Sequence, residues 1–184
     1  MALTYTPEVQ LGAHFPDFHL PGTDGKSYSS KALLNGKPTV VMFICNHCPY
    51  VQAIESRLIE LGRAYASQVN FIAICSNDAT EYPEDAFENL AKRAMEKNYP
   101  FPYLHDEDQR VAKLFSAVCT PDLFLYNNKG ALIYRGRLDD SWKDLSKVTK
   151  KELEKAIELS LKGECVPESE QNPSMGCSIK WKNI

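Results

Sequence analysis

The sequence has no apolar stretch that approaches the length of a membrane span, no internal repeat and no low-complexity segment. Its net charge is only -3, from 21 basic and 24 acidic residues, so no excess of one sign marks a nucleic-acid or anionic-membrane partner. The first residues also lack the basic start and long apolar core of a signal peptide. These absences lead us to expect a cytoplasmic protein that binds neither nucleic acid nor a membrane.

The 184 residues, 43% of them hydrophobic, are enough for a single domain with a core of its own. A chain of this length needs no disulfide staples, so an extracellular disulfide scaffold is not expected. In a reducing compartment, cysteines are buried hydrophobic residues, metal ligands or redox groups. The chain has six of them: Cys45, Cys48, Cys75, Cys119, Cys165 and Cys177.

Hydrophobic patterning predicts alternating strands and helices. Residues 39–44 form a continuous apolar and β-branched run, which is typical of a strand buried on both faces. Further strands are predicted over 69–75, 123–126 and 131–135, and helices after Cys48, over 85–97, over 109–115 and from a capping box at 149–152 to Gly163. Since parallel strands need crossovers and helices must cover both faces, this order predicts an α/β sandwich with a mixed central sheet.

The ends of the chain are predicted to differ from this pattern. Residues 1–12 read as a loose arm, and Asp24-Gly25 marks the turn of an N-terminal hairpin. Residues 1–163 would form the domain, and residues 164–184 an irregular tail packed on it. Residues 137–142 are predicted as a solvated loop.

The most informative residue is Cys48, which stands where a strand passes into a helix. Pro49 suits the first turn of a helix, where a missing N–H costs nothing. Cys48 would then be the N-cap residue, with free backbone N–H groups directed at its sulfur. Because a helix N-terminus carries partial positive charge, it favours the thiolate over the thiol. The sequence therefore predicts a nucleophilic thiolate at Cys48.

Several segments of the sequence resemble the thioredoxin fold. The strand–Cys48–helix element, a Thr120-Pro121 step before a strand, and a final hairpin and helix resemble that fold. The segment Phe15-Pro-Asp-Phe-His-Leu20 resembles the hairpin that opens peroxiredoxins and membrane-tethered thiol-disulfide oxidoreductases. More narrowly, the chain resembles a peroxiredoxin-like branch of the AhpC/TSA superfamily through Asn46-His-Cys-Pro-Tyr-Val51, Thr120-Pro-Asp122 and Gly176-Cys-Ser-Ile-Lys-Trp181. The resemblance implies a thioredoxin-like three-layer α/β sandwich with an N-terminal β-hairpin extension and a C-terminal tail.

The residues around Cys48 depart from both the thioredoxin motif and the peroxiredoxin motif. Cys48 matches the first cysteine of the thioredoxin Cys-x-x-Cys, and the second position falls on Val51, which forms no disulfide. The peroxiredoxin pattern is Pro-x-x-x-Thr-x-x-Cys, with a distant Arg that binds the peroxide. Here Val41 and Cys45 stand at the Pro and Thr, and Cys119-Thr-Pro-Asp stands where the Arg is expected. These departures favour disulfide exchange or weak peroxidase activity over an efficient peroxidase.

Three other cysteines are candidate partners of Cys48. Cys177 is either a resolving cysteine carried back by the tail or a bystander on a tail that docks through its apolar residues. Cys45 is either close enough to bridge Cys48 or a small core residue, and Cys119 is either an additional thiol or a packing residue. Cys165 and Cys177 are a further candidate pair.

The candidate substrate-binding residues are His47, Pro49, Thr120 and Pro121. Thr120-Pro121 resembles the cis-proline loop of thioredoxins, which faces the active cysteine. The resemblance implies a cis peptide bond there, with the Thr120 backbone presented to an extended substrate. His47 and Pro49 flank the predicted nucleophile in sequence.

We therefore expect a thiol oxidoreductase that needs no cofactor. Its substrate would be a disulfide or a peroxide, and its reducing partner thioredoxin or a low-molecular-weight thiol. The sequence does not specify the oligomeric state.

Two alternatives stay open. One is a Cu(I)- or Zn-binding module whose soft ligands would be Cys45, His47, Cys48 and Cys177. The pattern of Sco-type copper chaperones is Cys-x-x-x-Cys-Pro with a distant His. The spacing between Cys45 and Cys48 is one residue shorter than the spacing between the two cysteines of that pattern. The other alternative is a redox-inactive scaffold that keeps the fold without the chemistry.

Overall fold

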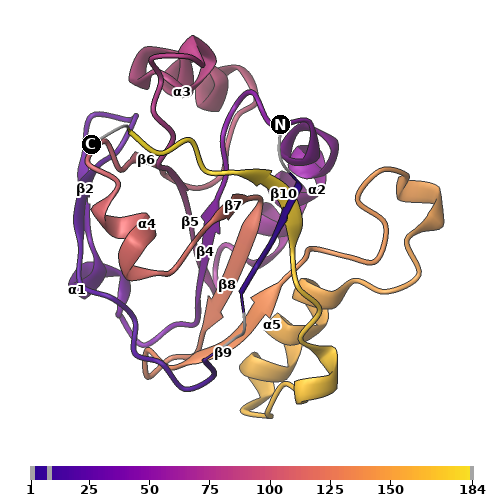
Figure 1. Cartoon of the computed structure of the whole chain (residues 1–184). Helices are drawn as coiled ribbons and strands as arrows, with labels where there is room; N and C mark the ends of the chain where they lie inside the picture. The colour runs from indigo at the N-terminus through magenta and orange to yellow at the C-terminus, as the bar shows by residue number, and fades with distance from the viewer. Residues whose placement is uncertain (1–2, 8–9, 183–184) are drawn as a thin grey trace.

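The computed structural model describes residues 3–7 and 10–182, and it centres on a five-stranded mixed sheet (Figure 1). The strand order is β6-β5-β4-β8-β9. β4 and β6 run parallel to β5, whereas β8 is antiparallel to both β4 and β9. This confirms the predicted mixed sheet closed by an antiparallel hairpin. The strands are β4 (Thr39–Phe43), β5 (Asn70–Cys75), β6 (Tyr103–His105), β8 (Asp122–Tyr126) and β9 (Leu132–Gly136).

Two apolar clusters cover the two faces of the sheet and produce the predicted three layers. Alternation along β4 separates them, with Val40 and Met42 in one cluster and Val41 and Phe43 in the other. The first cluster packs against α2 (Pro49–Tyr65), α3 (Phe87–Glu96) and α5 (Glu152–Lys162). The second packs against α4 (Arg110–Leu114) and the N-terminal hairpin, which comprises β2 (His19–Pro21) and β3 (Ser27–Ser29) and leads into α1 (Ser30–Leu33).

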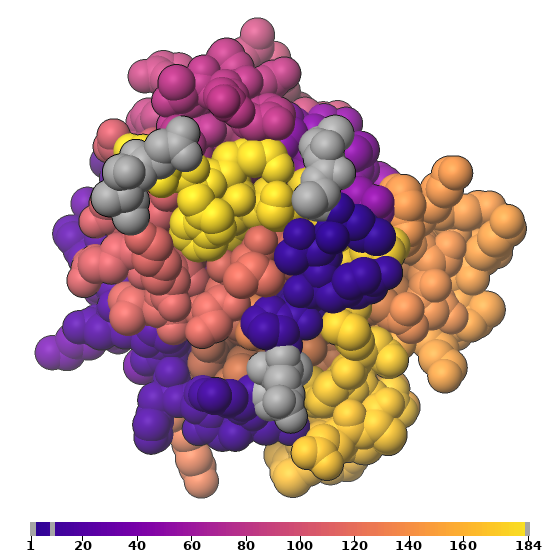
Figure 2. Space-filling model, in the orientation of Figure 1, coloured from indigo at the N-terminus to yellow at the C-terminus, as the bar shows by residue number. Residues whose placement is uncertain are grey.

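A second, small sheet joins the two ends of the chain. β10 (Met175–Ser178) lies between β1 (Leu3–Tyr5) and β7 (Cys119–Thr120) and is antiparallel to both. In the space-filling view, the yellow C-terminal segment crosses the front of the molecule with the indigo N-terminal segment beside it (Figure 2). The prediction of a loose arm over residues 1–12 is therefore wrong for Leu3–Tyr5, and residues 1–2 and 8–9 of that arm lie outside the described residues.

The tail differs from its prediction in the same way. Residues 164–184 were expected to be irregular, yet they contain the short turn η3 (Glu168–Glu170) and then β10. Residues 183–184 lie outside the described residues. Strand pairing orders this tail because β7 and β1 supply backbone partners that lie far away in the sequence.

Two of the helix boundaries also needed correction. The segment predicted as one helix over 85–97 is a 3-10 turn, η1 (Pro83–Asp85), followed by α3. The predicted capping box is wrong because Thr149 donates its N–H and hydroxyl to Asp140, and α5 begins after Lys151 without a side-chain cap. Gly163 ends α5 as predicted, with a left-handed φ of 75°. Among the described residues, no helix has the length and apolar character needed to span a membrane.

Candidate functional site

Cys48 lies at the junction that the sequence predicted. β4 ends at Phe43, a short turn follows, and Cys48 is the N-cap of α2, with Pro49 as the first helical residue. The Cys48 side chain is completely buried. As a thiol, Cys48 makes no capping hydrogen bond and instead donates to the Thr120 carbonyl oxygen, 3.2 Å from Sγ.

The surroundings of Cys48 favour its ionised form. A hydrogen bond from the Cys45 thiol lowers the pKa of Cys48, and burial opposes this effect. The Val51 backbone N–H, together with the thiol and backbone N–H of Cys177, adds to the lowering and brings the pKa to about 5. Val51 N–H belongs to the first turn of α2, where amides have no partner within the helix. These donors therefore favour the thiolate form of Cys48.

β10 brings Cys177 to this site from the other end of the chain. Cys177 lies opposite Thr120 in the β10–β7 pair and opposite Leu3 in the β10–β1 pair. Gly176 allows the close approach, because a Cβ atom at that position would lie 2.0 Å from the Thr120 carbonyl oxygen. Burial and the hydrogen bond to Cys48 raise the pKa of Cys177 to about 12. The tail thus places a protonated thiol next to the Cys48 thiolate.

The other predicted partner cysteines differ in their access to Cys48. Cys45 is buried, its Sγ lies 3.2 Å from Thr120 Oγ1, and burial with the hydrogen bond to Cys48 raises its pKa well above the usual range. Cys119 is buried on β7, and its Sγ points to the Pro121 carbonyl oxygen at 3.9 Å. Burial raises the pKa of Cys119 as well. The structure therefore brings Cys45 and Cys177 to Cys48 and engages Cys119 elsewhere.

All six cysteines belong to the described residues, and none of them forms a disulfide. Cys75 ends β5 inside the core, and burial raises its pKa. Cys165 is exposed in the segment after α5, whereas Cys177 is buried in β10, so the structure does not join this pair.

The Thr120–Pro121 peptide bond is cis, as the resemblance implies. A cavity of about 320 Å³ opens beside Pro121. Tyr50, in the first turn of α2, and Trp142 lie on its wall, and their rings are 4.4 Å apart. The prediction of a solvated loop over 137–142 is wrong in part. Arg57 donates to the Asp139 carboxylate and to the carbonyl oxygens of Ser141 and Trp142, and so fixes this loop against α2.

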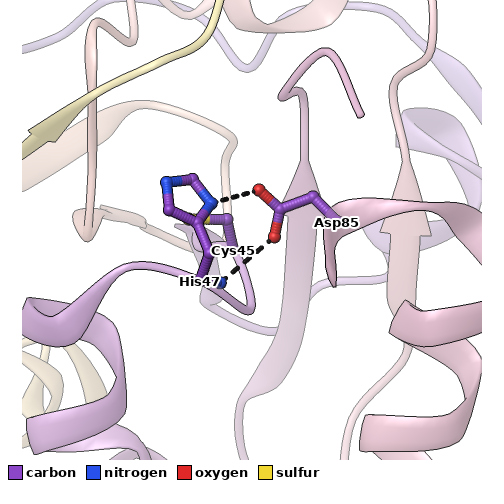
Figure 3. A group of neighbouring side chains, drawn as sticks. All are labelled: Cys45, His47 and Asp85. Atoms are coloured by element: carbon purple, nitrogen blue, oxygen red, sulfur yellow. Dashed lines mark hydrogen bonds and ion pairs between the residues drawn. The ribbon is translucent and has the colours of Figure 1, made fainter. Parts of the chain in front are cut away.

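His47 is held by a carboxylate that the sequence analysis missed (Figure 3). Its Nδ1 lies 2.5 Å from Asp85 Oδ2, and its ring stacks on Tyr82 with centroids 4.2 Å apart. Asp85 Oδ1 also accepts the N–H groups of Asn46 and His47, at 2.7 and 3.3 Å. Burial alone would raise the pKa of Asp85, but the hydrogen bonds from His47, Asn77 and Asn46 outweigh it and lower the pKa. The turn that precedes Cys48 is therefore built around a buried, ionised carboxylate.

The structure changes the predicted metal ligand set. Cys45, His47 and Asp85 each offer a ligand atom, and these atoms lie within 4.8 Å of one another. Among the described residues, the ligand atoms that gather in this way belong to Cys45, His47 and Asp85, and the predicted four-residue set that included Cys48 and Cys177 does not gather in this way. A thiol, an imidazole and a carboxylate are a donor set suited to zinc. In the structure, however, His47 Nδ1 and Asp85 are already bonded to each other.

Residues 11–135 match the family model described as the AhpC/TSA family. The chain belongs to the AhpC/TSA family. No curated protein matches the sequence significantly. Among solved structures, the chain is similar to an uncharacterized conserved protein from Geobacillus kaustophilus, with 42% identity and a TM-score of 0.94 over 100% of this chain and 98% of that one. It is also similar to a hypothetical protein from Sinorhizobium meliloti, with 36% identity and a TM-score of 0.93 over 98% of this chain and 100% of that one.

More distant structures agree on the fold. Peroxidoxin BcpB from Mycobacterium tuberculosis is 20% identical with a TM-score of 0.57, and covers 68% of this chain and 84% of its own. At this identity, the likeness shows the thioredoxin fold alone. It confirms the predicted fold, and the thiol-redox role of this AhpC/TSA protein is supported by the family match.

The structure also shows which side chains follow the cis-proline of this AhpC/TSA protein, where the peroxiredoxin resemblance placed an arginine. Asp122, directly after Pro121, is completely buried and accepts from Arg135 Nη2 at 2.7 Å. Arg135 also donates to the Ser116 carbonyl oxygen and packs over the Phe124 ring. Burial raises the pKa of Asp122 to about 6, against the opposing effect of Arg135. The Arg135 guanidinium is thus committed to this pair beneath the loop.

Proposed function

We propose that this protein is a thiol oxidoreductase in which Cys48 is the nucleophile and Cys177 the resolving cysteine. The observation that carries the proposal is the convergence of donors on Cys48, from the α2 N-terminus and from two neighbouring thiols, which lowers its pKa to about 5. The thiolate, not the thiol, attacks disulfides and peroxides. Cys177 lies against this thiolate because β10 pairs with the strand that ends at Thr120.

With a disulfide substrate, the Cys48 thiolate attacks one sulfur, and the other half of the substrate leaves as a thiolate. Cys177 loses its proton and attacks the Cys48 sulfur of the mixed disulfide. The second half of the substrate then leaves, and a Cys48–Cys177 disulfide remains. Two thiols of a reducing partner restore both cysteines and become a disulfide themselves. Thioredoxin or a low-molecular-weight thiol in the cytoplasm would supply these electrons.

With a hydroperoxide, the Cys48 thiolate attacks the terminal oxygen of the O–O bond. A sulfenic acid forms on Cys48, and the remaining alkoxide or hydroxide takes up a proton and leaves. The Cys177 thiol condenses with the sulfenic acid and releases water, which gives the same Cys48–Cys177 disulfide. We rank disulfide exchange or weak peroxidase activity above efficient peroxidase activity for two reasons. Arg135 is bound to Asp122, and Cys45 occupies the position of the Thr in the peroxiredoxin pattern.

Disulfide mapping after mild oxidation with diamide or hydrogen peroxide tests this proposal. Wild-type protein should yield a Cys48–Cys177 peptide pair, and Cys48→Ser should yield no intramolecular disulfide. Cys177→Ser should accumulate Cys48 as sulfenic acid or as a mixed disulfide with added thiol. A Cys48–Cys45 or Cys48–Cys119 bridge in Cys177→Ser protein at the wild-type rate would show that the tail is not the resolving element.

Alkylation of Cys48 with iodoacetamide near neutral pH separates this function from a redox-inactive scaffold. A thiolate that opens to solvent reacts at pH 6 nearly as fast as at pH 8, because its pKa lies below both values. A scaffold cysteine with an ordinary pKa reacts much more slowly at pH 6. Peptide mapping by mass spectrometry assigns the reaction to Cys48 rather than to exposed Cys165.

Metal binding is a second candidate function, favoured by the grouping of Cys45, His47 and Asp85. The neighbouring Nε2 of His47 is buried and has no hydrogen-bond partner. Metal analysis of protein purified without chelator tests this candidate. Stoichiometric zinc or copper that is lost in Asp85→Ala and Cys45→Ser would establish it. Metal-free protein whose thiols oxidise readily would rule it out.

A further inference from the structure

We propose that Asn77 is a positioning residue for the Cys48–Cys177 exchange, because it links the tail that carries Cys177 to the turn that carries Cys48. The inference rests on the proposed function and adds a residue that acts through others. Asn77 itself follows β5 and is almost completely buried. Its side-chain amide bonds in opposite directions, to Asp85 and to the tail backbone.

The first half of the link runs from Asn77 to the turn before Cys48. Asn77 Nδ2 donates to Asp85 Oδ2 at 2.8 Å. The other carboxylate oxygen, Asp85 Oδ1, accepts the backbone N–H groups of Asn46 and His47, the two residues directly before Cys48. Asn46 in turn accepts a hydrogen bond on its carbonyl from Gln52 of α2. The position of this carboxylate therefore fixes the backbone that delivers Cys48 to the helix N-terminus.

The second half runs from Asn77 to the tail. Asn77 Oδ1 accepts the backbone N–H of Lys180 at 2.9 Å, three residues after Cys177. The carbonyl of Lys180 is held by Asp78 N–H at 2.8 Å and by Gln109 Nε2 at 2.7 Å. Beyond the end of β10, Lys180 is thus held through both its N–H and its carbonyl, and one of its anchors is the same amide that supports Asp85.

This arrangement matters because disulfide formation tolerates little error in position. The two Cα atoms must lie about 4.4–6.8 Å apart, with Cβ atoms facing each other. Cys48 and Cys177 come from segments far apart in the sequence, and β10 pairs with β7 through only two residues. A buried side chain that bonds both segments restricts their relative movement. Burial strengthens the effect, because an unpaired amide or carboxylate there would lack compensation from water.

Gln109 provides a matched control. Its side chain anchors the tail through two hydrogen bonds, donating to the Lys180 carbonyl and accepting from Lys182 N–H, and it makes a third by donating to the Ser76 carbonyl. None of these three bonds involves Asp85. Gln109→Ala therefore removes two tail anchors and the bond to Ser76 but leaves Asp85 untouched, whereas Asn77→Ala removes one tail anchor and the support of Asp85.

The first measurement is the equilibrium constant for closing the Cys48–Cys177 disulfide in glutathione redox buffers, in a Cys165→Ser background. Asn77→Ala should lower this constant about tenfold, the effect of about 1.4 kcal/mol of lost positioning. Gln109→Ala should lower it less, although it removes more hydrogen bonds. An equal or larger loss in Gln109→Ala would overturn the inference, because simple anchorage would then explain the data.

The second measurement is the pKa of Cys48 in protein that lacks the tail thiol. In Cys177→Ser protein, ultraviolet titration of the Cys48 thiolate reports the turn and α2 without the Cys177 thiol as a donor. Adding Asn77→Ala should raise the titration midpoint of Cys48, and adding Gln109→Ala should leave it unchanged. No change with Asn77→Ala would overturn the link to the turn. Should Asn77→Ala fail to fold, Asn77→Asp tests the same point, because a carboxylate can still accept from Lys180 but repels Asp85.

Failure of the inference and failure of the proposed function give different results. If wild-type protein never forms a Cys48–Cys177 disulfide in any redox buffer, the resolving role of Cys177 is wrong. If the disulfide forms normally in wild-type protein and equally well in Asn77→Ala, the proposed function stands and the role of Asn77 is wrong.

Discussion

Replacing Gly176 with alanine is expected to separate β10 from β7 and expose Cys48. The added Cβ atom would lie 2.0 Å from the Thr120 carbonyl oxygen, 2.6 Å from the Thr120 carbonyl carbon and 3.0 Å from Pro121 Cδ. The nearest two of these are backbone atoms of a strand that lies beside the core, so β10 is the element that must move. Its movement takes Cys177 away from Cys48.

The size of the effect follows from the contacts that β10 loses. The β10–β7 pairing joins Cys177 to Thr120 and Ser178 to Cys119. Losing one or two ladder hydrogen bonds costs about 1–2 kcal/mol, which raises the population with an open tail about 5- to 30-fold. Loss of Cys177 as a donor also raises the pKa of Cys48 from about 5. The Cys45 thiol and the Val51 N–H still lower the pKa of Cys48, and we expect exposure of the sulfur to dominate its reaction rate.

We therefore expect Cys48 in Gly176→Ala to react with iodoacetamide at pH 7 about 5- to 30-fold faster than in wild-type protein, as measured by peptide mass spectrometry. The same variant should close the Cys48–Cys177 disulfide more weakly. Gly163→Ala is the matched control, since its left-handed φ of 75° makes alanine unfavourable at the end of α5 while the added Cβ would contact nothing within 4 Å. Faster alkylation in both variants, or unchanged disulfide closure in Gly176→Ala, would refute the reasoning.

Three further predictions follow from the same contacts. The pKa of Cys48 is about 5 in the folded protein against an ordinary 9.0, so the unfolded chain binds more protons between these values. The stability of wild-type protein relative to Cys48→Ser should therefore rise with pH across this range and become independent of pH below about pH 5, as measured by urea unfolding. Asp85→Ala should destabilise the protein by about 3 kcal/mol in the same assay, because it leaves the buried donors of Asn46 and Asn77 without an acceptor, whereas a loss below about 0.5 kcal/mol would contradict this account. Arg57→Met should release the loop that contains Trp142, seen as faster proteolysis within residues 139–148, and should leave the Cys48 titration unchanged.

The central fold elements could be predicted because their signals are local. β4 is apolar at every position after Thr39, and the spacing of buried residues along α2 identifies its inner face. Pro49 marks the start of the helix and hence the N-cap position of Cys48. These features depend on residues within a few positions of one another, so no knowledge of the rest of the chain is needed.

The features that were missed depend on partners far away in the sequence. β1 and β10 are three- and four-residue strands whose pairing is set by each other and by β7. The predicted capping box does not form because Thr149 donates to Asp140, which lies in a loop nine residues earlier. Asp85 stands 38 residues from His47, and no spacing rule connects them. One signal was present: Asn77 and His47 follow the adjacent parallel strands β5 and β4, whose carboxyl ends meet at one edge of the sheet.

The most direct test of the central claim is an absorbance titration of the Cys48 thiolate at 240 nm in reduced Cys165→Ser protein. The account predicts one transition near pH 5, absent in Cys48→Ser, while the buried thiols Cys45 and Cys177 stay protonated through neutral pH. A midpoint for Cys48 at or above its ordinary value of 9.0 would contradict the account.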